Sequence, residues 1–157
     1  MRKYRIMEIV CIVILVVFIG ILSKEETVSD KTVKEVASAV TETVDIKGLK
    51  KQKEMQLKKE LSLDAGEFDG VYFIKSGDVL DVREILIIKL KEGQSAEGAK
   101  EKIEKRLTDK QTLFEGYAPE QSAMLKNYCL KEKAGFIFYA VLDEKEAALS
   151  AFNKILK

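Results

Sequence analysis

The chain has 157 residues, with 27 lysine and arginine residues against 26 aspartate and glutamate residues and a formal net charge of +1. This length fits one compact domain with an appendage and excludes two ordinary domains. The balanced charge offers no basic surface, so we expect no nucleic-acid partner. The chain also has no histidine. The commonest general base and a common zinc ligand are therefore missing, and we expect neither catalysis nor a cofactor or metal.

An apolar run dominates the N-terminal region. Residues 9–22 read IVCIVILVVFIGIL, and as a helix the longer stretch 6–22 would span about 25 Å, which is marginal for a bilayer. Basic residues precede the run and KEE follows it, which favours a cytoplasmic N-terminus at residues 1–5 and an extracellular body. We therefore predict a single-pass protein of the cell membrane, with a transmembrane signal anchor at 6–22.

Two sequence features bear on how this segment is processed. Val10 precedes Cys11, at the start of the apolar run, which does not match a lipoprotein signal, where a small residue precedes a cysteine at the end of the run. The stretch FIGILSKEE contains no small-x-small cleavage pattern. We favour an uncleaved anchor, with a cleaved signal peptide as the alternative.

A polar tether at residues 23–31 leads to an extracytoplasmic domain at residues 32–157. Thr32 and Glu35 have the spacing of a capping box and open a predicted helix in TVKEVASAVTETV. After Gly48, the lysine-rich stretch at 49–63 predicts a second helix, and DAGEFDG is typical of a turn.

Beyond this turn, hairpins alternate with helices. Short runs rich in β-branched and aromatic residues predict strands at 71–75, 84–90, 127–132 and 136–142. Helical spacing predicts a long helix capped by Ser95 and ending near Tyr117, a short helix at 119–126, and a last helix capped by Asp143 with Glu146. These elements form two ββα units. They predict an α+β fold with an antiparallel sheet of about four strands packed by helices.

Two predicted strands, EILIIKL and FIFYAVL, are apolar at nearly every position instead of alternating. Such strands indicate a sheet covered on both faces. We expect the N-terminal helices to cover the second face. The alternative is that part of this face receives a partner or a second copy of the chain, which would make a homodimer.

An ordered string of motifs carries a resemblance to a known family. The string EILIIKLKEG, a helix with Arg106, the spacing Phe114-x-x-Tyr117-x-Pro119-x-Gln121 and the string GFIFYAVLDE together resemble the bacterial domain of unknown function 4358. Members of that family are exported proteins, mostly of Gram-positive anaerobes, anchored by a lipid or an N-terminal helix. The family has no established activity, so the resemblance implies an extracytoplasmic α+β domain and no catalytic residues.

The corner between the two predicted helices is the first candidate binding site. Tyr117, Pro119 and Gln121, with Arg106 nearby, are candidate ligand contacts. The structural alternative has Tyr117 packed under the proline corner with its hydroxyl bonded to the backbone. In that alternative Pro119 opens the next helix, and Arg106 pairs with a nearby carboxylate.

A lysine cluster is the second candidate. It consists of Lys47, Lys50, Lys51, Lys53, Lys58 and Lys59. Of these, Lys50, Lys51, Lys58 and Lys59 are the candidates for contact with anionic headgroups or acidic wall polymers outside the membrane. The alternative is an ordinary solvated helix face.

Three other groups are weaker candidates. Asp64, Glu67 and Asp69 in DAGEFDG suggest calcium, but an EF-hand aligned on Gly70 would need an oxygen ligand at Ala65 and a glutamate at position 76, so a solvated turn is the better interpretation. Asp78 and Asp81 have the residue types of an acid/base pair but no accompanying aromatic platform for sugar. Cys129 has no histidine to activate it and is interpreted as a small core residue of a strand.

These observations favour a membrane-anchored accessory or binding module of the bacterial cell envelope, which contacts another envelope protein or a wall polymer. One alternative is an envelope enzyme that depends on carboxylates or a metal. Another is a sensor of a small ligand.

Overall fold

The computed structural model describes residues 7, 10–17 and 28–157. Residues 10–17 are helical and exposed to solvent. Among the described residues, no helix combines the length and apolar character needed to cross a membrane. The predicted anchor at 6–22 falls only in part on described residues, and the predicted cytoplasmic residues 1–5 lie outside them.

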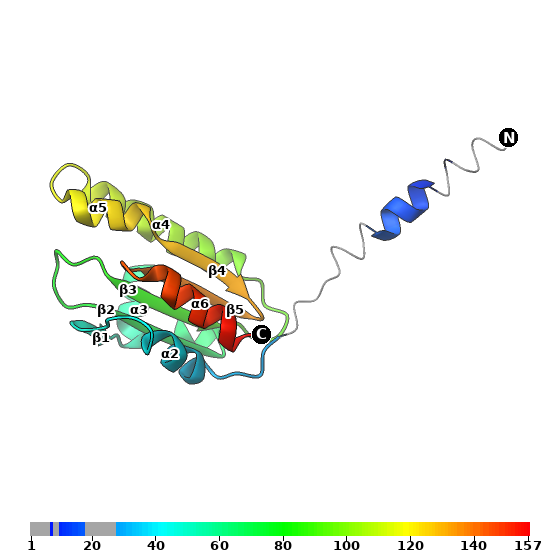
Figure 1. Cartoon of the computed structure of the whole chain (residues 1–157), viewed down its shortest axis with the longest axis horizontal. Coiled ribbons are helices and arrows are strands. Elements are labelled where there is room, and N and C mark those ends of the chain that lie inside the picture. The colour runs from blue at the N-terminus through cyan, green and yellow to red at the C-terminus, as the bar shows by residue number, and fades with distance from the viewer. Residues whose placement is uncertain (1–6, 8–9, 18–27) are drawn as a thin grey trace.

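The centre of the domain is an antiparallel sheet of five strands (Figure 1). The strands are β1 (Leu49–Lys51), β2 (Gly70–Ser76), β3 (Glu84–Lys89), β4 (Cys129–Lys133) and β5 (Phe136–Val141). Their order across the sheet is β1-β2-β3-β5-β4, and each neighbouring pair is antiparallel. The predicted α+β class is confirmed. The sheet has one strand more than the four expected, and that extra strand is β1.

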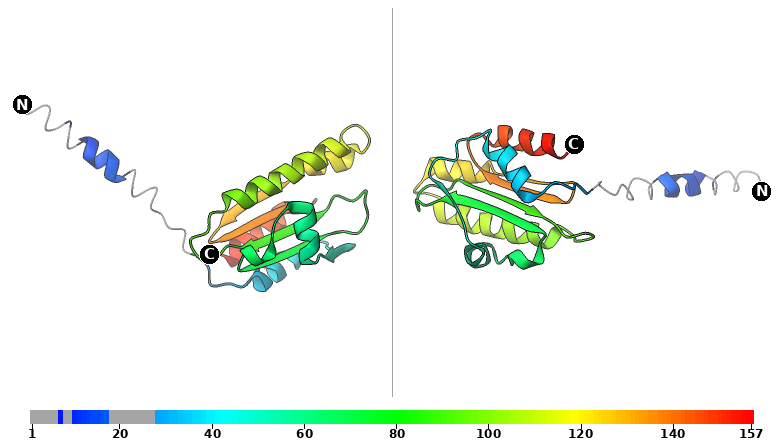
Figure 2. Two further views of the ribbon diagram at one scale, coloured as in Figure 1. Left: turned by 180° about the vertical axis from the view of Figure 1, so that it is seen from behind. Right: turned by 90° about the horizontal axis from the view of Figure 1, so that it is seen from below.

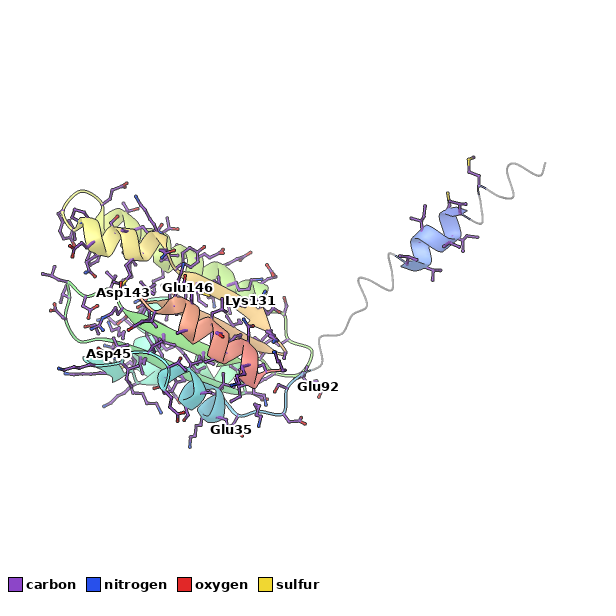
Figure 3. All side chains as sticks on the ribbon, viewed as in Figure 1. Glu35, Asp45, Glu92, Lys131, Asp143 and Glu146 are labelled. Atoms are coloured by element: carbon purple, nitrogen blue, oxygen red, sulfur yellow. The ribbon has the colours of Figure 1, made fainter. Side chains whose placement is uncertain are left out.

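Helices connect and cover these strands. They are α2 (Val33–Thr41), α3 (Glu54–Leu61), the 3-10 turn η1 (Ala65–Glu67), α4 (Glu97–Phe114), α5 (Pro119–Lys126) and α6 (Lys145–Ile155). The predicted capping box is present at the start of α2, where Glu35 N donates to Thr32 Oγ1 at 3.3 Å and Thr32 N donates to Glu35 Oε2 at 2.8 Å. Glu35 is labelled in Figure 3.

The predicted helix at 49–63 was wrong in its first part. Residues 49–51 form β1, and α3 begins only at Glu54. The reason is the open edge of β2: Lys50 pairs with Lys75 across the ladder, and Gln52 N donates to Phe73 O at 2.8 Å. Ladder hydrogen bonds to β2 therefore take the place of the first helical turns, because a free strand edge offers unpaired backbone groups.

Two other predicted helix starts also differ. The N-cap of α6 is Glu144, one residue later than Asp143, and neither it nor Glu146 closes a capping box. This shift places Glu146 at the second helical position, where the capping-box spacing is lost. Figure 3 shows Asp143 and Glu146 near the start of α6. The N-cap of α4 is Ala96, and the Ser95 hydroxyl instead accepts a hydrogen bond from Glu97 N at 3.3 Å.

The sheet is covered on both faces, as expected (Figure 2). Helices α3, α4 and α5 contribute to the core cluster on one face, and α2 and α6 contribute to the cluster on the other. Side chains of β3 alternate between the two clusters, so that Leu86 belongs to the first and Ile87 to the second, and both are fully buried. The N-terminal helices therefore divide between the two faces. The chain's own helices bury β3 and β5, so the burial of these strands requires no second copy.

The two ends of the sheet are distinguished by where the chain enters the domain. The register places Glu84 opposite Val141 at one end and Lys89 opposite Phe136 at the other, roughly 17 Å away along the strands. Ser29 N donates to Ala134 O at 3.0 Å in the β4–β5 turn. The described chain therefore enters the domain at the Phe136 end. We call the Glu84 end the distal end.

We expect Phe152→Ala to lower the free energy of unfolding by about 3–5 kcal/mol, because it opens a cavity under α6. The Phe152 ring is fully buried and stacks on Phe138 with ring centroids 5.0 Å apart. Urea unfolding followed by circular dichroism measures the change. Met55→Ala is the control, because Met55 is 74% exposed. A loss below about 1 kcal/mol at Phe152 would contradict the assigned core.

Candidate functional site

A buried carboxylate lies at the start of β3, at the distal end. The Glu84 side chain has no exposed surface, and its Oε1 accepts hydrogen bonds from Arg106 Nη1 at 2.5 Å and from the Tyr139 hydroxyl at 2.8 Å. Its Oε2 accepts one from Lys110 Nζ at 3.2 Å. Arg106 and Lys110 are four residues apart on α4 and so lie on the same side of the helix. Glu84 thus joins α4 to two central strands.

A second carboxylate extends this cluster. Arg106 Nη2 donates to Glu60 Oε2 at 2.8 Å, and Lys75 Nζ lies 2.5 Å from Glu60 Oε1. We use the name Glu84 network for Glu60, Lys75, Glu84, Arg106, Lys110 and Tyr139. Three cations against two carboxylates leave one surplus positive charge in the Glu84 network. No buried side-chain nitrogen or oxygen among the described residues lacks a hydrogen-bond partner.

Burial and ion pairing act in opposite directions on this network. Burial alone would raise the pKa of Glu84, but attraction from Arg106 and Lys110, with hydrogen bonds from Arg106 and Tyr139, holds that pKa below its ordinary value. Burial lowers the pKa of Lys110, despite the opposing attraction of Glu84. Burial and the Glu84 charge both raise the pKa of the Tyr139 hydroxyl. Glu84 is therefore ionised at neutral pH, while burial makes the charged form of Lys110 less favourable than it is in water.

A pocket of about 260 Å³ opens over this network. Its lining includes the charged residues of the Glu84 network, the loop between β2 and β3, and the end of α4 at Leu113 and Phe114. Val79 in the loop is 87% exposed and Leu113 is 65% exposed, so the rim is apolar while the floor is charged. We call this the tip pocket.

Hydrogen bonds within the β2–β3 loop order one wall of the tip pocket. Asp78 N donates to Ser76 Oγ at 3.1 Å, and Leu80 N donates to Asp78 Oδ1 at 2.9 Å. Arg83 Nε and Nη2 both donate to the Asp81 carboxylate, the latter at 2.7 Å. Burial opposes the ionisation of Asp81, but these hydrogen bonds lower its pKa. Asp78 and Asp81, which the sequence analysis considered as an acid/base pair, thus both form hydrogen bonds that order the β2–β3 loop.

The predicted corner contributes to the same site through Gln121. Pro119 is the first residue of α5, as predicted, and Gln121 Oε1 accepts a hydrogen bond from Val82 N at 3.1 Å. This bond ties α5 to the β2–β3 loop. The predicted packing of Tyr117 under the corner was wrong: α4 ends at Phe114, and the Tyr117 ring is 57% exposed and stacked on Phe114 at 5.5 Å. Arg106 pairs with carboxylates, as the structural alternative expected.

The four candidate lysines do not share one surface. Lys50 and Lys51 are neighbours on β1, so their side chains point to opposite faces of the sheet. Lys51 Nζ lies 5.8 Å from the centre of the Tyr72 ring. On α3, Lys58 pairs with Asp64 at 2.9 Å and Lys59 is exposed.

The remaining candidates have ordinary surroundings. The Asp64 carboxylate accepts hydrogen bonds from Gly66 N and Lys58 Nζ. Within the part of the chain that the structure describes, no group of three or more acidic or cysteine side chains is arranged to hold a metal ion. Cys129 is half-buried beside the second core cluster, and burial raises the pKa of its thiol.

The sequence analysis did not identify Glu84 and Lys110 as site residues, although each is a charged residue within an otherwise apolar pattern. Glu84 is the one charged residue at the start of an apolar strand, and Lys110 interrupts the apolar stripe of α4. A lysine in such a stripe, four residues after Arg106, indicates a buried acidic partner. The pattern does not identify which of many glutamates that partner is.

A family model described as Domain of unknown function (DUF4358) matches residues 42–142. The chain belongs to the DUF4358 family. No curated protein and no solved structure matches the chain. The DUF4358 match includes the whole sheet and every residue of the Glu84 network, and it leaves out α2 and α6.

We expect Glu84→Gln to lower the free energy of unfolding by about 3–5 kcal/mol at pH 7, because it leaves Arg106 and Lys110 buried without their opposite charge. A carboxylate whose folded pKa is lowered stabilises the fold above its unfolded pKa of about 4.3, and this contribution disappears as the pH falls through the folded pKa. The gap between wild type and variant should therefore shrink from pH 7 to pH 3.

Urea unfolding over a series of pH values measures this gap. Glu115→Gln is the matched control: its side chain is 71% exposed and 3.9 Å from Lys126, so we expect no measurable change. A Glu84→Gln variant within about 1 kcal/mol of wild type at pH 7 would show that the network does not stabilise the domain.

Proposed function

We propose that this chain is a membrane-anchored binding module on the outer side of a bacterial cell membrane, which acts by contact with another envelope protein. Three features support the proposed location and orientation in the membrane: the apolar stretch at 6–22, the basic residues before it and the acidic residues after it. The missing histidines support a role without catalysis.

The observation that carries the proposal is a set of exposed apolar side chains at the distal end. Val79, Leu80, Leu113 and Tyr117 are 57–87% exposed. We call these four residues the apolar tip. They come from two segments that meet at the tip pocket, because Val79 and Leu113 both line it and Tyr117 stacks on Phe114, which also lines it. Clustered apolar exposure of this kind marks interaction sites.

The position of the apolar tip fits an anchored protein. The described chain enters at the opposite end of the sheet, where Ser29 contacts the β4–β5 turn. The β2–β3 loop and the α4–α5 corner lie together at the far end of the domain in both figures (Figures 1 and 2). A module anchored through its N-terminus would therefore present the apolar tip away from the membrane.

The charge around the apolar tip suits a partner with basic residues. Asp78, Glu115 and Glu120 are exposed there, against two exposed lysines, Lys126 and Lys50, whose side chain lies beside Gly77. This excess of acidic residues favours an apolar partner segment with flanking lysine or arginine side chains, and disfavours acidic wall polymers. Contact with a wall polymer is therefore the weaker form of the proposal.

An enzyme that uses Asp78 and Asp81 has less support from the geometry. Asp81 is held ionised by Arg83, and a general acid works best with a pKa near the working pH. Asp78 caps the backbone of its own loop. A sensor of a small ligand remains the second candidate, and the tip pocket is the observation that favours it.

We expect the native chain to remain in the membrane fraction after an alkaline wash and to be released only by detergent. External protease should digest the body in intact protoplasts, because the body lies outside. Deleting residues 6–22 should abolish both results. Recovery of the chain from the cytosolic fraction without detergent would disprove the proposed membrane location.

We expect a photocrosslinking amino acid at position 79 to capture a defined envelope protein in living cells. The same probe at position 55 should capture nothing, because Met55 is also highly exposed, at 74% against 87% for Val79, but lies on α3, outside the apolar tip. Adding Leu113→Asp should reduce capture at position 79 at least tenfold, through loss of apolar contact at the rim. Absent adducts at position 79, or identical adducts at position 55, would exclude the apolar tip as the contact surface.

A further inference from the structure

The three cations of the tip pocket differ in how close their ionic contacts are. Lys75 and Arg106 make close contacts of 2.5–2.8 Å with Glu60 and Glu84. Lys110 has one ionic contact, to Glu84 at 3.2 Å, and none with any other described residue. An ammonium group has three donors. Lys110 thus has the longest ionic contact of the three cations and, like Lys75, two donors left for another acceptor, so we assign the surplus positive charge of the Glu84 network to Lys110.

The carboxylates in the wall do not compensate this charge. Asp81 is neutralised by Arg83, which binds it through two nitrogen atoms. Asp78 is exposed on the loop, where solvent screens its charge. The floor thus has one unmatched positive charge, and the charge of a multiply charged anion such as phosphate would exceed it. One carboxylate matches this pattern best.

The apolar part of the lining specifies what the carboxylate is attached to. Val79, Leu113 and Phe114 line the pocket together with Lys110. A volume of about 260 Å³ is below the usual range for drug-sized ligands, so the occupant is a small group. An aliphatic side chain next to the carboxylate would contact these three residues.

We propose that the tip pocket binds a single carboxylate that is attached next to an aliphatic side chain, with Lys110 donating to the carboxylate and Val79, Leu113 and Phe114 contacting the side chain. This deepens the proposed binding role by naming the group that the pocket takes. The same chemistry occurs at the C-terminus of a peptide and in a free small carboxylic acid.

The test uses the full-length chain in lipid nanodiscs and three matched probes. N-acetylleucine has both the carboxylate and the side chain, N-acetylleucinamide lacks the charge, and N-acetylglycine lacks the side chain. We expect N-acetylleucine to raise the melting temperature with concentration, and the other two probes to bind at least about tenfold more weakly. No stabilisation at tens of millimolar, or equal binding of the amide, would overturn the proposal.

Variants locate the site. Lys110→Met should weaken N-acetylleucine binding about tenfold or more, because it removes a charge-assisted hydrogen bond. Lys105→Met is the control, since Lys105 is exposed on the same helix and does not line the tip pocket. Val79→Asp, in an exposed loop position, should also weaken binding by placing a negative charge at the mouth, and it tests the site even if Lys110→Met does not fold. Unchanged binding in Val79→Asp and in a folded Lys110→Met would place the ligand elsewhere.

A second comparison separates the two sources of the ligand. A leucine-terminated tetrapeptide that binds more tightly than 4-methylpentanoate would identify a peptide C-terminus, and equal affinities would identify a free acid. Either result supports the carboxylate site. Crosslinking at position 79 reports protein contact without any of these probes, so failure of the carboxylate site and failure of the proposed function are distinguishable.

Discussion

The distal end of this domain depends on the burial of one charged group. Removing a carboxylate such as Glu84 from water costs several kcal/mol unless opposite charges and hydrogen bonds replace the lost water. Here these come from Arg106 and Lys110 on α4 and from Tyr139 on β5. The three elements are therefore held in one arrangement at this end, since a shift of any of them would leave a buried charge without its partner. The same contacts position the floor of the tip pocket.

The packing of the sheet determines where a binding surface is available. Strands β3 and β5 are buried by α2 and α6 on one face and by α3 and α4 on the other. The faces of the sheet are thus occupied by the chain's own helices, and the loops at its ends are among the surfaces that remain. One end receives the N-terminal segment at the β4–β5 turn. The other carries the β2–β3 loop and the α4–α5 corner, which explains why the pocket and the exposed apolar side chains occur together.

The β2–β3 loop is ordered by polar contacts although its apolar side chains face outward. Asp81 binds Arg83, and Gln121 accepts a hydrogen bond from Val82 N across 39 residues of sequence. These contacts hold Val79 and Leu80 away from the core, where they remain exposed. A loop held in this way loses little conformational entropy on binding, which favours affinity. Order combined with apolar exposure is consistent with the proposed contact surface.

Sequence alone determined the parts of this protein that depend on neighbouring residues. The Thr32–Glu35 capping box, Pro119 at the start of α5 and the strands β3 and β5, which are apolar at nearly every position, follow from local spacing and composition, and with them the α+β class. Only the tertiary structure decided β1, because its pairing uses an edge of β2 more than 20 residues away. It also decided the site: the partners of Glu84 lie 22, 26 and 55 residues from it in sequence. Local patterns show that a charge is buried, but only the packing of α4 on the sheet determines which opposite charges meet it.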